Sequence, residues 1–215
     1  MKVKTAYTLF TAILCWFGLL LQLYLILTND TSGVSFWGRF FNFFSFFTIL
    51  TNILVAVSLT CTLMKSRGRS GVFFTKPEVQ TASAVYILIV GIIYVTVLQR
   101  LWKPQGLQWV ADIILHYAIP ALYTIYWLTI VPKGHSKWKH CFRWLIYPAL
   151  YFAYSIARGA VTGWYPYPFL NVKQNGFNNT LLNAVAILGF FIIVGFIFIG
   201  IDKYFARTKV AAETV

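Results

Sequence analysis

Two ionisable residues, Asp112 and His116, stand four positions apart inside an apolar stretch of the chain. In an α-helix, residues i and i+4 lie on one face, so the carboxylate and the imidazole would meet the same neighbours. An ionisable group within a membrane is costly and by default marks a functional site. An aspartate that orients a histidine lets the imidazole work as a general base. A hydrogen-bonded core histidine is the competing interpretation, and the sequence leaves both open.

A hydroxyl group for such a base to activate occurs in the segment Phe40–Asn52, which reads FFNFFSFFTILTN. On a continuous helix, its polar residues Asn42, Ser45, Thr48 and Asn52 would share an arc of about 120°. A threonine hydroxyl becomes a nucleophile when a base removes its proton during attack, and nearby donors stabilise the oxyanion that forms. The alternative is structural, because most serine and threonine hydroxyls within membranes bond back to a carbonyl or join helices.

Two arginines complete the set of residues with a chemical role. Arg158 and Arg100 are expected near the outer membrane surface, where a guanidinium group can receive a substrate carboxylate through two hydrogen bonds. No cofactor is expected, because one histidine and one aspartate on a helix do not complete a metal site, and a single histidine within the spans does not ligate a di-haem centre.

A loop that reads VTGWYPYPFLNV precedes the last apolar block. Its prolines exclude a regular helix, and its aromatic residues are typical of a membrane interface. Anchoring at the interface is one interpretation of this loop. The other is a rigid lid over a cavity that holds Thr48 and His116, and the lid residues would be Trp164, Tyr167, Pro168 and Phe169.

The elements that position these residues are predicted to be membrane-spanning helices. The 215 residues are 59% hydrophobic and 11% charged, which is far more apolar than a soluble domain. The apolar residues form blocks of about 20, the length that crosses a hydrocarbon core of about 30 Å. We expect an all-α fold, a single domain over residues 1–215 with six spans: Tyr7–Leu27, Phe40–Met64, Ala82–Leu98, Val110–Val131, Phe142–Val161 and Leu181–Ile201.

The formal net charge of +13 is distributed unevenly over this six-helix arrangement. Only Arg39, Arg100, Lys103, Arg158 and Lys173 fall on or near one side, and the remaining Lys and Arg residues fall on the other. This positive-inside pattern predicts that both termini are cytoplasmic. It makes bilayer lipids the expected contact of the basic residues and argues against nucleic-acid binding.

The topology also predicts the depth of the two central residues. Thr48 would lie about 12 Å below the outer start of its helix and His116 about 9 Å below the start of its own, at about 1.5 Å per residue. Both would therefore share one level in the outer half of the bilayer, which permits a hydroxyl–imidazole pair. Two other functions stay open: a small-molecule or lipid transporter, which also needs ionisable groups inside the membrane, and a lipid-binding protein without catalytic activity.

Three segments resemble the androgen-induced FAR-17a-type membrane family, whose bacterial branch is called Pr6Pr. Phe46–Asn52 is similar to the second-helix motif of that family, and His116–Pro120 to its His-x-x-x-Pro element. The segment Val161–Leu170 is similar to its Val-Thr-Gly…Tyr-Pro-Phe-Leu signature. The resemblance spans most of the chain in order and topology, and only these short patches are specific.

The resemblance implies an activity. Animal members of the family hydrolyse fatty acid esters of hydroxy fatty acids (FAHFAs) with a threonine nucleophile and a histidine, which correspond by motif position to Thr48 and His116. It implies a threonine-dependent lipid-ester hydrolase whose substrate enters from the membrane, and a bacterial inner (plasma) membrane location.

Overall fold

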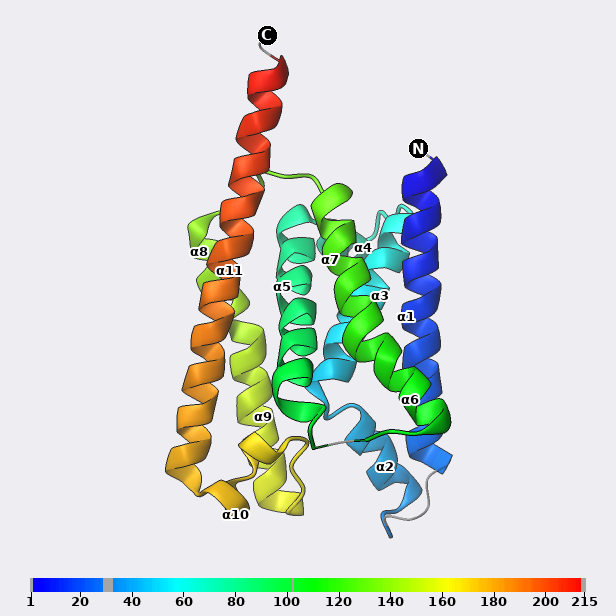
Figure 1. The fold of residues 1–215 in the computed structure, drawn as a ribbon, viewed down its shortest axis with the longest axis vertical. Coiled ribbons are helices and arrows are strands. Elements are labelled where there is room, and N and C mark those ends of the chain that lie inside the picture. Colours follow the sequence, from blue (N-terminus) through cyan, green and yellow to red (C-terminus); the bar gives the residue numbers. More distant parts are fainter. Residues whose placement is uncertain (1, 29–32, 102, 214–215) are drawn as a thin grey trace. The chain divides into compact units, whose positions relative to one another are not determined.

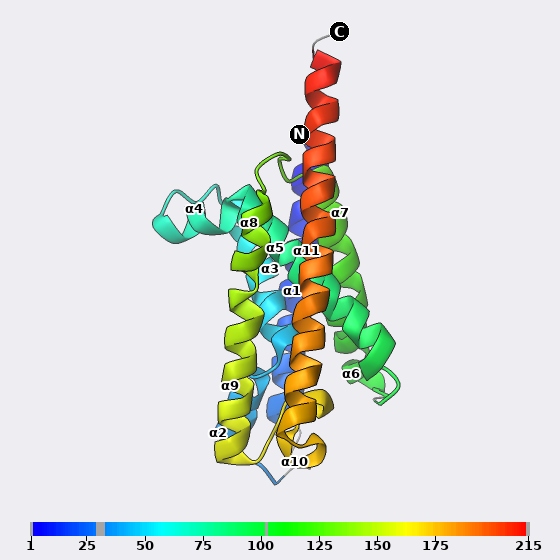
Figure 2. The ribbon, with the colours of Figure 1, turned by 90° about the vertical axis from the view of Figure 1, so that its left-hand side faces the viewer.

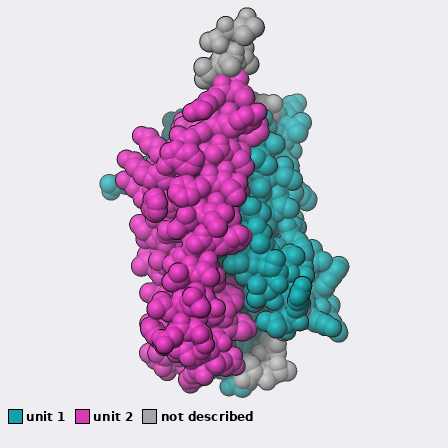
Figure 3. Space-filling view, turned by 60° about the vertical axis from the view of Figure 1, so that its left-hand side comes forward, with its two compact units in different colours: residues 1–132 teal, residues 133–215 magenta. Residues whose placement is uncertain are grey.

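The computed structural model describes residues 2–28, 33–101 and 103–213, and every regular element in these ranges is a helix (Figure 1). The chain divides into two compact units, Met1–Pro132 and Lys133–Val215, which are coloured separately in Figure 3. The all-α class expected from the sequence is confirmed for the described residues, and the single domain over residues 1–215 stays a prediction.

The first unit is built around a π-helical turn, η2, that contacts three longer helices, α1, α3 and α5. The helix α1 also packs against α3, α6 and α7, while α3 packs against α4 and α5, and α5 against α7. Figure 2 shows α4 projecting sideways from the long helices of this unit. The elements are α1 (Lys2–Thr28), α2 (Phe36–Phe43), α3 (Phe47–Leu63), α4 (Arg69–Thr75), α5 (Pro77–Ile93), η1 (Tyr94–Leu98), α6 (Gly106–Ile113), η2 (Ile114–Ala118) and α7 (Ile119–Thr129).

The expected second span is broken in the middle of its phenylalanine run. The helices α2 and α3 meet at an angle of 65°. At the junction, the Ser45 N–H donates to the Asn42 carbonyl (3.0 Å), and the Ser45 hydroxyl donates to the Phe41 carbonyl (2.7 Å). A continuous helix over Phe40–Met64 is therefore wrong. The prediction that the polar residues share one arc of a single helix is also wrong, because Asn42 lies on α2 whereas Thr48 lies on α3.

The fourth expected span contains the turn η2 directly before Pro120. The Ile119 N–H donates to the carbonyl of Ile114, five residues earlier, which is the hydrogen bond of a π-helix. Pro120 has no N–H group to offer the His116 carbonyl four residues before it, so the regular α-helical ladder is interrupted here. A second π-turn, η1, ends α5 without a proline, and in it the Gln99 N–H donates to the Tyr94 carbonyl (2.9 Å).

Two glycines let neighbouring helices approach η2 closely. A Cβ atom built on Gly18 of α1 would lie 2.6 Å from Ile114 Cγ2. A Cβ on Gly91 of α5 would lie 3.0 Å from Pro120 Cβ and 3.2 Å from the His116 carbonyl oxygen. Small residues at helix contacts are the usual means of close packing within membranes. The backbone that carries His116 is thus held between α1 and α5.

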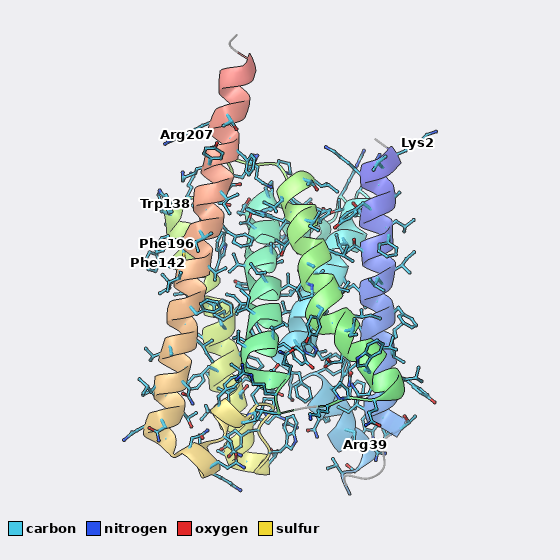
Figure 4. All side chains as sticks on the ribbon, in the orientation of Figure 1. Lys2, Arg39, Trp138, Phe142, Phe196 and Arg207 are labelled. Atoms are coloured by element: carbon cyan, nitrogen blue, oxygen red, sulfur yellow. The ribbon has the colours of Figure 1, made fainter. Side chains whose placement is uncertain are left out.

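The second unit consists of α8 (Trp138–Trp144), α9 (Ile146–Thr162), η3 (Pro168–Leu170), α10 (Val172–Asn175) and α11 (Phe177–Glu213). The long helix α11 packs against α8 and α9. Trp138 and Phe142 of α8 meet Phe196 of α11, with ring centroids 5.7 and 6.0 Å from that of Phe196 (Figure 4).

The loop before α8 is fixed to α11 by a buried carboxylate. Asp202 is fully buried, and its Oδ2 atom accepts a hydrogen bond from the Ser136 N–H (3.0 Å). Lys133 lies half-buried in the same loop. Burial lowers the pKa of Lys133 to about 8 from an ordinary 10.5, although the charge of Asp202 opposes that shift by raising the pKa.

Within the part of the chain that the structure describes, three helices are long and apolar enough to cross a membrane: Lys2–Thr28, Pro77–Leu98 and Phe177–Thr208. The bent pair α2–α3 makes a fourth if it is one span. The other two expected spans are helical but consist of shorter pieces, α6–η2–α7 and α8–α9. Several long apolar helices indicate a membrane protein, and the full count of six remains a prediction.

Candidate functional site

His116 is held by Asp112 from one turn earlier in the first unit. The imidazole Nδ1 atom lies 3.1 Å from Asp112 Oδ1 and 3.2 Å from the Asp112 carbonyl oxygen. Both oxygens are acceptors, so Nδ1 carries the hydrogen and a neutral imidazole then has its lone pair on Nε2. The Asp112 side chain is 6% exposed and that of His116 is 16% exposed. A carboxylate that fixes the tautomer of a partly accessible imidazole prepares it to accept a proton at Nε2.

A residue that the sequence analysis missed, Tyr94 of η1, completes this cluster. Its hydroxyl group donates to Asp112 Oδ2 (2.5 Å). Its ring stacks on the His116 imidazole with a centroid distance of 3.9 Å and an interplanar angle of 15°. The only signal in the sequence was a polar aromatic residue inside the third apolar block. No spacing rule links Tyr94 to a histidine 22 residues later.

Asn52 connects the helix that carries Thr48 with the turn that carries His116. The Asn52 side chain is fully buried, and its Nδ2 atom donates to the Thr48 carbonyl (2.8 Å) and to the Leu115 carbonyl (3.3 Å). The Cys15 thiol of α1 donates to the Asn52 carbonyl (3.3 Å). One amide nitrogen therefore reaches the backbone of Thr48 and the backbone of the residue directly before His116.

Thr48 itself is buried at the second position of α3, immediately after the break in the helix. In the first turn of any helix, the N–H groups have no carbonyl one turn earlier within that helix. The aligned peptide dipoles also give this end a partial positive charge. The break therefore sets the Thr48 hydroxyl beside the electropositive start of α3, an environment that a straight helix would not have provided.

The remaining residues of the expected polar arc have other surroundings. Ser45 is fully buried, and its hydroxyl bonds back to Phe41 at the end of α2, which agrees with the structural interpretation of intramembrane hydroxyls. Asn42 is half-buried on α2, and its carbonyl accepts the Ser45 N–H. Arg100 is exposed in the turn that follows η1.

On a regular α-helix, Tyr123 and Trp127 of α7 would lie on the same face as Asp112 and His116. Tyr123 and Trp127 are fully buried, and they donate to Ser58 Oγ (3.3 Å) and Thr81 Oγ1 (3.0 Å) respectively. The π-turn η2, which contains His116, holds an extra residue and changes the phase of the helix before Tyr123 and Trp127. Tyr123 and Trp127 therefore connect α7 to α3 and α5 as parts of the core.

Arg158 and the residues of the expected lid belong to the second unit. The Arg158 guanidinium lies over the Trp164 ring, with its Cζ atom 4.6 Å from the ring centroid, a cation–π contact. Gly163, with φ at +71°, ends α9 in the left-handed conformation that glycine adopts without strain. This turn brings the aromatic loop back onto α9, where a Cβ atom on Gly159 would overlap the Tyr165 ring.

The rest of the loop is ordered by stacking and by amide contacts. Tyr167 is buried and stacks on Phe169 with ring centroids 5.2 Å apart. The Phe169 carbonyl accepts from Asn183 Nδ2 (3.0 Å), and the carbonyl of the exposed Pro168 accepts from Asn175 Nδ2 (2.7 Å). These stacking and hydrogen-bond contacts hold the loop in one conformation. Thr48 and His116 belong to the first unit, and the role of the loop as their lid stays a prediction.

Among the described residues, no three His, Cys, Asp or Glu side chains come close enough together to hold a metal ion. The three cysteines, Cys15, Cys61 and Cys141, are free.

The fold and the site together define a helical membrane protein with a histidine–aspartate–tyrosine cluster beside a broken helix. The chain was compared with family models, curated proteins and solved structures, and none of them matches it.

Proposed function

We propose that the protein is an intramembrane lipid-ester hydrolase in which Thr48 is the nucleophile and His116 is the general base. The observation that supports this best is the contact of His116 Nδ1 with two oxygen atoms of Asp112. Both acceptors at Nδ1 belong to Asp112, so the Nε2 lone pair is available for a substrate or a nucleophile. A positioned general base contributes about 10²–10⁴-fold to a rate.

The proposed reaction has two steps. In the first, the Thr48 hydroxyl attacks the ester carbonyl while Nε2 of His116 takes its proton. The tetrahedral intermediate then expels the alcohol, which receives that proton, and an acyl-threonine ester remains. In the second, His116 takes a proton from water, the hydroxide attacks the acyl group, and Thr48 leaves with the proton. The products are one carboxylic acid and one alcohol.

The start of α3 is the proposed binding site for the oxyanion. The N–H groups of its first turn point along the helix axis toward the break, and the helix dipole favours negative charge there. One such donor is worth about 3–4 kcal/mol in comparable hydrolases. In this proposal Asn52 has a positioning role, because its amide ties Thr48 to the turn that carries His116.

The proposed substrate is an amphiphilic ester of a fatty acid with a hydroxy fatty acid. Two considerations favour this class. The short motifs around Thr48 and His116 resemble those of enzymes that cleave such esters, and a site formed by apolar helices is accessible to acyl chains from the bilayer. Arg100 and Arg158 are the proposed contacts for the free carboxylate of the substrate.

The proposed topology has six spans with both termini in the cytoplasm, and the bacterial inner membrane is the proposed location. Within the first unit, Lys2 and Arg39 lie at opposite ends (Figure 4). This separation agrees with a cytoplasmic Lys2 and an outer Arg39 in the positive-inside arrangement.

The test is hydrolysis of a panel of lipid esters by the purified protein in lipid nanodiscs, followed by mass spectrometry of the released acid. We expect Thr48→Ala and His116→Ala each to lower kcat/KM by about 10³-fold or more while the protein stays folded. Thr51→Ala is the matched control, because Thr51 is a fully buried hydroxyl on the same helix. His135→Gln is the control for histidine loss outside the first unit.

The acyl-threonine intermediate gives a second, direct test. Rapid acid quenching during turnover should leave an acyl group on Thr48, located by peptide mass spectrometry, and Thr48→Ala should remove it. Undiminished hydrolysis in either variant would refute the assignment. Copurified intact lipid without acylation would favour the lipid-binding alternative, and flux into proteoliposomes that depends on Asp112 would favour a transporter.

A further inference from the structure

Two π-turns from different helices meet at the proposed base. Tyr94 begins η1 and His116 lies within η2, and their rings stack at 3.9 Å. Single π-turns within helices are rare and occur frequently at functional sites. Here the two π-turns bring the phenol ring of Tyr94 against the imidazole of His116, although the two residues belong to different long helices. The proposed function assigns roles to His116 and Asp112 but none to Tyr94.

The hydrogen bonds divide the Asp112 carboxylate between two partners. Oδ2 accepts from the Tyr94 hydroxyl, and Oδ1 faces His116 Nδ1. A carboxylate with a donor on only one oxygen can rotate about its Cβ–Cγ bond. A second donor on the other oxygen fixes the rotation, so Oδ1 stays directed at the imidazole. Networks of this kind in a buried site strengthen each member bond.

The ring of Tyr94 restricts the imidazole in a different way. It covers one face of His116 at an interplanar angle of 15°, so the imidazole cannot flip about its Cβ–Cγ bond without breaking the stack. A flip would put Nδ1 where Cδ2 was and Nε2 where Cε1 was, so Nδ1 would lose Asp112 and the lone pair would leave the side where the nucleophile is expected. The Tyr94 hydroxyl therefore acts on Asp112, and the Tyr94 ring acts on His116.

On the basis of the proposed hydrolase function, we propose that Tyr94 is a positioning residue for the general base. Its hydroxyl fixes the carboxylate of Asp112, its ring fixes the imidazole of His116, and together they keep the neutral histidine in the tautomer that presents Nε2. Tyr94 itself gives up no proton in the reaction.

Tyr117 provides a matched control from the same cluster. Its hydroxyl makes an equally short bond to Gln99 Oε1 (2.5 Å), and its ring meets that of Tyr94 edge-on at 5.5 Å. These two contacts join the same pair of π-turns but involve neither member of the His116–Asp112 pair. Tyr117→Phe therefore measures the effect of losing a tyrosine hydroxyl at this helix contact without disturbing the base.

The experiment measures turnover and records the ¹⁵N NMR spectrum of protein labelled with ¹⁵N in its imidazole rings. The signals of His116 are those that disappear in His116→Gln. In the wild type we expect a hydrogen-bearing Nδ1 and a hydrogen-free Nε2. In Tyr94→Phe, the two nitrogen signals should move toward each other as the second tautomer becomes populated. We expect kcat to fall about tenfold with KM unchanged, the effect of one lost hydrogen bond to a charged group. Tyr117→Phe should retain both the wild-type spectrum and the wild-type kcat.

A purely structural role for Tyr94 predicts different results. The folded fraction of Tyr94→Phe would fall, while the spectrum and the kcat of the remaining folded protein would match the wild type. That outcome overturns the proposal. If Tyr94→Phe does not fold, 3,5-difluorotyrosine incorporated at position 94 keeps the shape of the residue and strengthens its donor. Changed His116 signals then support the proposal, and unchanged signals overturn it.

The two proposals fail separately. If the wild type hydrolyses no ester in the panel, the proposed function fails, and the tautomer spectra of wild type and Tyr94→Phe still decide the positioning role. If the wild type is active and Tyr94→Phe retains its spectrum and its kcat, the positioning role fails and the hydrolase assignment stands.

Discussion

The contact between Gly18 and Ile114 allows a quantitative test of how η2 is held. In Gly18→Ala, the new methyl group would lie 2.6 Å from Ile114 Cγ2, 3.1 Å from Leu115 Cδ2 and 3.3 Å from Ile114 Cβ. Carbon atoms pack best at about 3.5–4.0 Å, so the first of these contacts overlaps by about 1 Å. Ile114 is buried and β-branched, so its Cγ2 atom cannot move aside freely. The turn itself must shift away from α1.

The expected magnitude has two parts of opposite sign. Overpacking a buried contact costs about 1–3 kcal/mol, and replacing glycine by alanine inside a helix gains about 0.5–1 kcal/mol. Gly189→Ala is the control for the second part, because a Cβ atom there meets nothing within 4 Å in the described structure. The difference in free energy of unfolding between the two variants isolates the overpacking term, so Gly18→Ala should be less stable by about 1–3 kcal/mol.

The assay is equilibrium unfolding of both variants in mixed detergent micelles, extended by a double-mutant cycle with Ile114→Ala. If the methyl group and the isoleucine compete for one space, the double variant should lose less stability than the sum of the single variants, by about 1 kcal/mol or more. Equal stability of Gly18→Ala and Gly189→Ala, or strict additivity in the cycle, would refute the close approach of α1 to η2.

Three further predictions concern other groups. Asp112→Asn should lower kcat by about 10³–10⁴-fold with little change in KM, measured with the best ester of the panel, because an amide in place of the carboxylate no longer fixes the tautomer. Lys133 should react with an amine reagent with a midpoint near pH 8, because burial lowers its pKa from 10.5. Asp202→Asn should lower that midpoint further, since the carboxylate of Asp202 raises the pKa of Lys133. Mass spectrometry of labelled peptides across a range of pH checks both predictions. Trp164→Leu should speed hydrogen exchange of the loop after α9 by a few-fold, since the lost cation–π contact with Arg158 is worth about 0.5–1 kcal/mol.

The helical positions could be predicted from the sequence because long apolar blocks have few alternatives within a membrane. The pairing of Asp112 with His116 was also predictable, since four residues on one helix bring two side chains together whatever the neighbours are. The structure finds these two groups in contact.

The break between α2 and α3 could not be predicted, because the segment from Phe40 to Asn52 contains no proline and no glycine. The chain bends at Phe44–Phe46, where local hydrogen bonds of Ser45 close one helix and a new helix begins. No rule of composition distinguishes this serine from one in a continuous helix. The electropositive helix start beside Thr48 therefore had no signature in the sequence.

Tyr94 was missed for a related reason. Its partners lie 18 and 22 residues later on a different helix, and only the packing of α5 against η2 brings them together. The close approach depends on Gly91, whose small size allows the contact but does not indicate which side chains will meet.

The turn η2 also has a consequence for how this helix tolerates changes in length. A π-turn accommodates one residue more than the α-helical turn it replaces. Deleting one residue between Ile114 and Ala118 could therefore restore an uninterrupted α-helix instead of unfolding it. The part of the helix that precedes the deletion would rotate by about 100° relative to the part that follows. Asp112 would turn away from Tyr94 while Trp127 kept its place, so a shortened chain would remain assembled yet lose the cluster.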